Sequence, residues 1–144
     1  MKTRTKLFIL LLLGSLLACS DDSTSPREQN IVWLTAQSWG HAHVNHETDG
    51  NLSSQYSNFA ILFTAQSSQG YDGTFMISHG GNAFAEATGM WRFNSDLTKL
   101  ILNSGQELNF QLEADHLQLD FYVADPGGRS SGLSGHFVFE LSPL

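Results

Sequence analysis

Three closely spaced histidines, His41, His43 and His46, have the residue type and spacing that a metal site requires. Imidazole nitrogens are good ligands for zinc, copper and nickel. Residues two apart in a strand project from the same face, about 7 Å apart, so His41 and His43 can approach one ion. His46 falls on the opposite face unless the strand ends or bulges before it. A zinc or nickel site is therefore a hypothesis here, and ordinary surface histidines are the simpler interpretation; no other cofactor is expected.

Two arginines, Arg92 and Arg129, are candidates for holding a carboxylate. A guanidinium binds a carboxylate through two parallel hydrogen bonds, and a binding pocket needs such polar groups amid an apolar wall. The simpler interpretation is that each arginine lies on the surface and pairs with an acidic neighbour.

The one cysteine of the chain, Cys19, lies at the end of an apolar N-terminal segment. Lys2, Arg4 and Lys6 precede the apolar run from Leu7 to Leu17, which is too short to span a bilayer and is typical of a secretory signal. The four residues 16–19, Leu-Leu-Ala-Cys, resemble the lipobox of bacterial lipoproteins. That resemblance implies cleavage after residue 18 and acylation of Cys19. Because one acyl chain binds membranes only marginally, two or three chains would make the anchor stable.

The charge of the chain argues against nucleic acid as a partner. Cleavage of residues 1–18 removes three of the seven basic residues, so that four remain against fourteen acidic ones, a net charge of −10 in place of −7. A surface this acidic repels phosphate backbones and anionic lipid, which leaves the acyl chains as the membrane anchor. The first mature residues, Cys-Ser-Asp-Asp (19–22), resemble the acidic export signal of surface-exposed lipoproteins of Bacteroidetes. We therefore expect a lipid-anchored protein of the bacterial cell envelope, at the outer membrane and exposed on the surface.

Alternation of apolar and polar residues predicts an all-β domain over residues 31–144, preceded by the signal peptide (1–18) and a polar, flexible tether (19–30). Residues 31–37 form a short apolar piece, which we interpret as a helical turn that plugs one end of a sheet. The expected strands are 39–46, 58–64, 71–78, 90–93, 97–102, 108–112, 117–122 and 137–141. Turn residues such as Asn, Asp and Gly separate them, and no long helical period occurs. Eight sequential antiparallel strands close most simply as an up-and-down barrel, with a two-sheet sandwich as the alternative.

Three stretches resemble small lipocalin-like lipoproteins of Bacteroidetes. Residues 88–96, Thr-Gly-Met-Trp-Arg-Phe-Asn-Ser-Asp, are similar to a Ser-Gly-Thr-Trp-Ser-Phe stretch of that family, and 128–139 are similar to its C-terminal ending. Residues 34–39 resemble its opening Leu-x-Gly-x-Trp, although Gln37 replaces the usual glycine. The resemblance implies a lipocalin-like barrel on a lipid anchor and carries no catalytic residues.

These observations predict a non-catalytic binding or accessory module of the envelope, not an enzyme. No His-Glu-x-x-His motif, phosphate loop or dinucleotide fingerprint occurs. The expected partners are the membrane, through the N-terminal lipid, and a small apolar ligand or an envelope protein. Two alternatives stay open: a structural or interaction lipoprotein with a filled barrel core, and a hydrolase with carboxylates in the barrel mouth.

Overall fold

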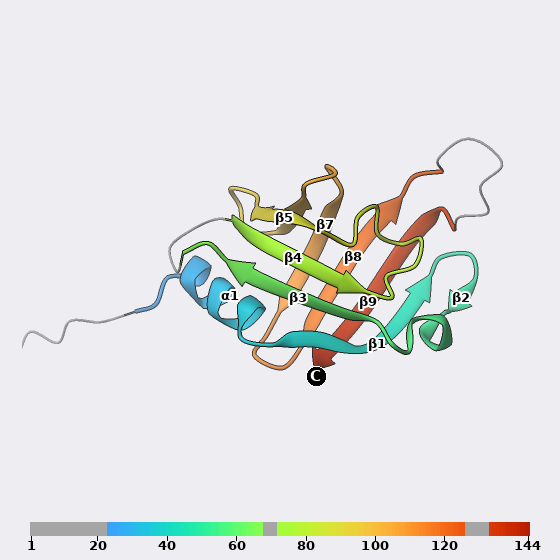
Figure 1. Cartoon of the computed structure of the whole chain (residues 1–144), viewed down its shortest axis with the longest axis horizontal. Helices are drawn as coiled ribbons and strands as arrows, with labels where there is room; N and C mark the ends of the chain where they lie inside the picture. The colour runs from blue at the N-terminus through green and yellow to red at the C-terminus, as the bar shows by residue number, and fades with distance from the viewer. Residues whose placement is uncertain (1–22, 68–71, 126–132) are drawn as a thin grey trace, which may run out of the picture.

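The computed structural model describes residues 23–67, 72–125 and 133–144 (Figure 1). The helices and strands follow one another in chain order as α1 (Pro26–Thr35), β1 (Ser38–His46), β2 (Gly50–Asn51), the 3₁₀-helix η1 (Ser53–Tyr56), β3 (Ala60–Ala65), β4 (Asp72–Ser78), β5 (Thr88–Phe93), β6 (Lys99–Leu102), β7 (Glu107–Leu112), β8 (Leu117–Val123) and β9 (Gly135–Pro143).

Every pair of neighbouring strands is antiparallel, and the sheet closes on itself. The strand order is β2-β1-β3-β4-β5-β6-β7-β8-β9, and β1 also pairs with β9. The start of β1 meets β3, where Trp39 lies opposite Ile61. On its other side β1 pairs with β9, from Trp39 opposite Pro143 to His46 opposite Phe137. Closure removes the exposed edges of the main strands. The prediction of an eight-stranded antiparallel barrel is therefore confirmed, with β2 as one additional short strand, and the two-sheet sandwich is excluded.

The interior of the barrel is packed with aromatic rings. Phe139 of β9 is fully buried and contacts the rings of five other residues, with centroids 4.9–6.2 Å apart. These are Tyr56, Phe59, Phe84, Phe121 and Phe137. A second group joins Trp91 to Phe63 and Phe93, with centroids 6.0 and 5.0 Å apart. The alternating apolar residues of the sequence therefore meet one another in one buried core.

Helix α1 covers one end of the barrel beside β3 and β7 (Figure 1). It buries Ile31 and Leu34, and the indole Nε1 of Trp39 donates a hydrogen bond of 3.0 Å to the carbonyl of Leu34. The short apolar piece predicted at 31–37 thus belongs to a helix that plugs the barrel end.

The tether predicted for residues 19–30 ends earlier than the sequence analysis placed it, because α1 begins at Pro26. Ser25 and Glu28 form a capping box: the Glu28 amide donates to Ser25 Oγ at 3.3 Å, and the Ser25 amide donates to Glu28 Oε2 at 3.0 Å. Two of the amide groups exposed at the helix start are satisfied in this way. The polar composition of this segment therefore reflects a helix cap.

Candidate functional site

The structure does not bring the three histidines of the predicted metal site together. His41 and His43 are exposed on the outer face of β1, whereas His46 is buried, 4% exposed, on the inner face. A bulge between Gly40 and His43 shifts the register with β9, and His41 lies there with a φ of +48°. The bulge precedes His43, so strict alternation carries His46 inward. Within the described ranges, no three His, Cys, Asp or Glu residues are grouped so that they could hold a metal ion.

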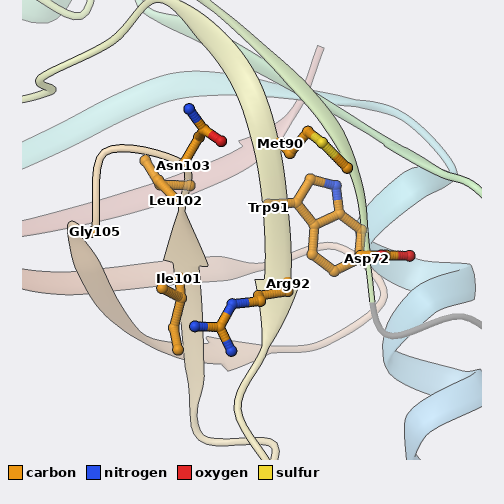
Figure 2. Close-up of a pocket in the computed structure, with 8 residues that line it drawn as sticks. All are labelled: Asp72, Met90, Trp91, Arg92, Ile101, Leu102, Asn103 and Gly105. Carbon is orange, nitrogen blue, oxygen red and sulfur yellow. The ribbon is translucent and has the colours of Figure 1, made fainter.

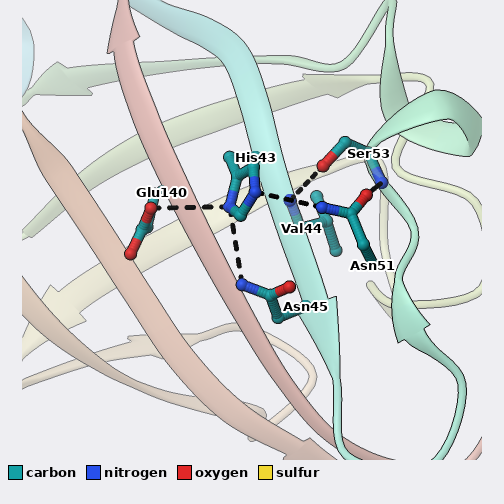
Figure 3. A network of polar contacts seen from close by, with 6 residues as sticks. All are labelled: His43, Val44, Asn45, Asn51, Ser53 and Glu140. Atoms are coloured by element: carbon teal, nitrogen blue, oxygen red, sulfur yellow. Dashed lines mark hydrogen bonds and ion pairs between the residues drawn. The ribbon is translucent and has the colours of Figure 1, made fainter.

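His43 instead belongs to a polar network that ties β1 to its neighbours (Figure 3). Its Nε2 lies 3.0 Å from the Asn51 side-chain amide nitrogen, and its Nδ1 lies 3.5 Å from a Glu140 carboxylate oxygen. Its Nδ1 also lies 3.4 Å from the Asn45 side-chain amide nitrogen, so both ring nitrogens have polar neighbours. Asn51 Oδ1 in turn accepts from the Ser53 amide at 3.0 Å, and Ser53 Oγ accepts from the Val44 amide at 3.0 Å. Both ring nitrogens of His43 are therefore engaged by neighbouring side chains of the wall.

His46 is held on both sides by hydrogen bonds of the inner face. Its Nε2 lies 3.1 Å from the carbonyl oxygen of Ser134, which can only accept, so Nε2 donates. Its Nδ1 lies 3.2 Å from the Asp49 amide and 2.8 Å from the Asp49 carboxylate. The ring also packs on Phe137, with centroids 4.5 Å apart. A histidine that acts as a general base needs an Nε2 that faces a nucleophile, and here a carbonyl takes that position.

Arg92 lies on the outer wall of the barrel, in a groove of about 310 Å³ between β4, β5 and β6 (Figure 2). Its cross-strand neighbours are Asp72 on β4 and Ile101 on β6. Figure 2 shows the guanidinium extending beside Ile101, while the Asp72 carboxylate points away from it. The ion pairs among the described residues do not include Arg92. The groove is lined by Asp72, Met90, Trp91, Arg92, Ile101, Leu102, Asn103 and Gly105.

Arg129, the second arginine predicted to bind a carboxylate, lies outside the described residues. Cys19 and the whole predicted signal peptide also lie outside them. The segment 128–132, Gly-Arg-Ser-Ser-Gly, also has the spacing of a Gly-x-Ser-x-Gly nucleophile elbow, which the sequence reasoning missed. That elbow joins a strand to a helix in α/β hydrolases. Here the segment lies between β8 and β9, two antiparallel neighbours, so the surrounding elements do not match the elbow.

A histidine–aspartate pair on β8 and β9 was not expected, because sequence spacing scatters these residues. His136 Nε2 lies 2.7 Å from Asp120 Oδ1, and both side chains are about one-third to two-fifths exposed. The pair arises because Asp120 lies opposite Val138 and Tyr122 lies opposite His136 in the ladder. Only the register of these two strands could have revealed it.

Among the described helices, α1 included, none has the length and apolar character needed to cross a bilayer. Comparison with models of known protein families finds no match, and no curated protein sequence is significantly similar to this chain.

Proposed function

We propose that this protein is a lipid-anchored, non-catalytic binding module of the bacterial envelope that uses the outer wall of a filled barrel. The observation that carries the proposal is the filled interior: the inward side chains of all eight barrel strands contribute to one buried core. A barrel of this size can hold a ligand only where side chains leave room. Binding is therefore assigned to the outside, where Arg92 lines a groove.

The N-terminal sequence supports the membrane anchor. The Leu-Leu-Ala-Cys motif at 16–19 follows a basic and then an apolar segment, in the order that a lipoprotein signal requires. The acidic mature chain would not adhere to anionic lipid by charge. Three stretches that resemble lipocalin-like lipoproteins are consistent with the same assignment. Cys19 precedes the start of α1 by seven residues in the sequence, so a short polar spacer would separate the anchor from the domain.

The groove around Arg92 supports a ligand that combines a carboxylate with a short apolar part. Arg92 has no acidic partner among the described residues, so its guanidinium keeps all its donors for a ligand. Met90 is 44% exposed on one side and Ile101 flanks the guanidinium on the other, which provides apolar contact. A few polar groups within an apolar wall are what small-molecule sites present.

Binding of octanoate tests the groove. We expect the protein, purified in detergent, to bind octanoate with perturbation of the backbone amides of Met90, Arg92 and Ile101 in NMR spectra. Arg92→Gln should weaken binding about tenfold, because a charge-assisted hydrogen bond is lost. Lys99→Gln is the matched control, since Lys99 is already paired with Glu107 at 2.6 Å. Equal octanoate affinity in wild type and Arg92→Gln would overturn the assignment of the groove.

Cell fractionation tests the anchor separately. Cys19→Ser removes the only thiol of the chain, and we expect the protein to move from the membrane to the soluble fraction. Retention of Cys19→Ser in the membrane fraction would contradict a lipid anchor without affecting the assignment of the groove.

The filled core equally favours a second candidate, a structural or interaction lipoprotein whose wall contacts another envelope protein. Cross-linking in intact cells separates the two candidate functions. The variant carries Met90→Cys as the cross-linking site and Cys19→Ser, so that it has a single thiol. An added membrane helix replaces the lost lipid anchor. A single cross-linked protein product would favour this candidate, and octanoate binding would favour the first.

A further inference from the structure

The outer face of β6–β9 carries two depressions next to the groove at Arg92, which they adjoin at Gly105. We propose that it binds a neutral oligosaccharide, with one sugar ring packed on the phenol ring of Tyr122. The amide and carboxylate side chains beside that ring form the hydrogen bonds. This proposal depends neither on the lipid anchor nor on the groove at Arg92.

The surface is hollowed in a form that suits an extended ligand. One depression of about 420 Å³ extends to Tyr122 and His136, and a neighbouring one of about 240 Å³ extends to Gln111. Both are lined by Asn109 and Asp120, so the two depressions adjoin on the same face. Two adjoining open depressions suit a ligand of linked units, whereas a closed pocket would hold only one unit.

Tyr122 provides the apolar contact. It is 63% exposed on the outer side of β8, while its chain neighbour Phe121 is 2% exposed in the core. An exposed aromatic ring offers a flat apolar face with a hydroxyl at its rim. One face of a pyranose ring presents C–H groups, which pack on such a surface, while its hydroxyls point outward to polar neighbours.

Polar side chains with donors and acceptors line the two depressions. In the ladder between β7 and β8, Asn109 lies opposite Asp120 and Gln111 lies opposite Gln118. Carboxamides donate and accept at fixed positions in one plane, and sugar hydroxyls also do both. Because the ladder fixes the backbone positions of these residues, a ligand has only their side chains to order when it binds.

Lys99 and His136 on this face each contact a carboxylate oxygen, which disfavours an anionic ligand. Lys99 Nζ lies 2.6 Å from Glu107 Oε2, and His136 Nε2 lies 2.7 Å from Asp120 Oδ1. A phosphate or a carboxylate would find no unpaired cation in the described part of this face. A neutral sugar chain, in contrast, uses the paired groups as hydrogen-bonding partners without separating them.

An NMR titration of the protein in lauryldimethylamine oxide tests the proposal, because this detergent carries no sugar. The probes are cellohexaose, maltohexaose and chitohexaose, each up to about 10 mM, a range that covers weak association. We expect at least one of them to shift the backbone amides of residues 107–111 and 118–122. Absence of shifts with all three probes, or shifts confined to the groove at Arg92, would overturn the proposal.

Two variants at one position separate stacking from hydrogen bonding. Tyr122→Ala should raise the dissociation constant about tenfold, because the ring contact is lost. Tyr122→Phe should retain affinity within about twofold, because the ring remains and the hydroxyl contributes only one hydrogen bond. Met76→Ala, which truncates another exposed apolar side chain on β4, is the matched control and should leave the dissociation constant unchanged. Equal affinity of wild type and Tyr122→Ala would overturn the stacking role assigned to Tyr122.

Discussion

The inner and outer faces of the same strands are organised by opposite rules. Inside, neighbouring rings contact one another, and the only buried polar side chain among the described core residues, His46, is hydrogen-bonded on both nitrogens. Outside, the polar side chains differ from strand to strand in whether they have a charged neighbour. Arg92 has no acidic partner in the described chain, whereas Lys99 and His136 each have one. The comparison teaches that the interior accounts for stability and leaves the wall free to carry function.

Truncation of the most connected ring gives the largest expected effect. Phe139→Ala should lower the free energy of unfolding by about 3–5 kcal/mol, because a fully buried ring is lost and a cavity remains among its five ring partners. Urea denaturation followed by tryptophan fluorescence measures the change. A loss below about 1 kcal/mol, the size typical of a surface site, would show that the interior is loosely packed.

A loosely packed interior would reopen the possibility of a ligand inside the barrel. Leu133, which is only partly buried against the core, serves as the comparison position for Phe139. Leu133→Ala should cost less than Phe139→Ala, because fewer contacts are lost. Reversal of this order would contradict the distribution of packing described here.

Replacement of the buried histidine has the next largest expected effect. His46→Leu keeps an apolar volume of similar size but leaves the Ser134 carbonyl and the Asp49 amide without their partner. Both hydrogen bonds are partly buried, and an unsatisfied buried group costs about 1–3 kcal/mol, so we expect a loss near the lower end of that range, measured by urea denaturation at pH 7. His43→Leu, on the outer face of the same strand, is the control and should cost less, because water can replace the lost bonds. An unchanged stability of His46→Leu would show that the histidine is not a required part of the core.

The sequence predicted most of the division between inward and outward side chains. It did not predict the strand pairing that closes the barrel. Alternation placed Trp91 and Phe93 on one side and Arg92 on the other, which the structure confirms. The same alternation carried His46 inward, as strict period two requires. The capping box at Ser25 and Glu28 was present in the sequence, but composition alone suggested a flexible tether.

Other features depend on contacts between distant segments. Pairing of β1 with β9 joins residues nearly a hundred positions apart, and nothing in the local pattern specifies that register. The filling of the core depends on how side-chain volumes from different strands fit together, which composition does not determine. The pair of Asp120 and His136 likewise requires the register of β8 and β9, so sequence spacing alone separated two residues that lie in contact.

Alkaline pH should weaken the interior through Tyr56. Burial raises the pKa of the Tyr56 phenol above its ordinary value of 10.0, because the ionised form loses solvation. Above pH 10 the unfolded chain releases this proton and the folded chain retains it, so stability falls as the pH rises, by at most about 1.4 kcal/mol per pH unit. Below pH 10 both states keep the proton and this contribution is fully present.

The Tyr56→Phe variant isolates this contribution. Its ring remains in the core but cannot ionise, so the difference in unfolding free energy between wild type and variant should grow in favour of the variant from pH 10 to 11. Urea denaturation at a series of pH values measures it. Parallel pH profiles for the two proteins would contradict a buried, neutral phenol.

The smallest effect is expected from the outer wall, and it tests the comparison directly. Met76 is 53% exposed on β4, between the inward residues Phe75 and Ile77. Met76→Ala should change the free energy of unfolding by no more than about 0.5 kcal/mol, because its side chain is already largely hydrated. Phe75→Ala, one position away on the inner face, should cost about 3 kcal/mol or more. Since the two substitutions share a strand and a local backbone, a similar loss in both would mean that the wall is not energetically separate from the core, and residues that bind ligands there could not vary independently of folding.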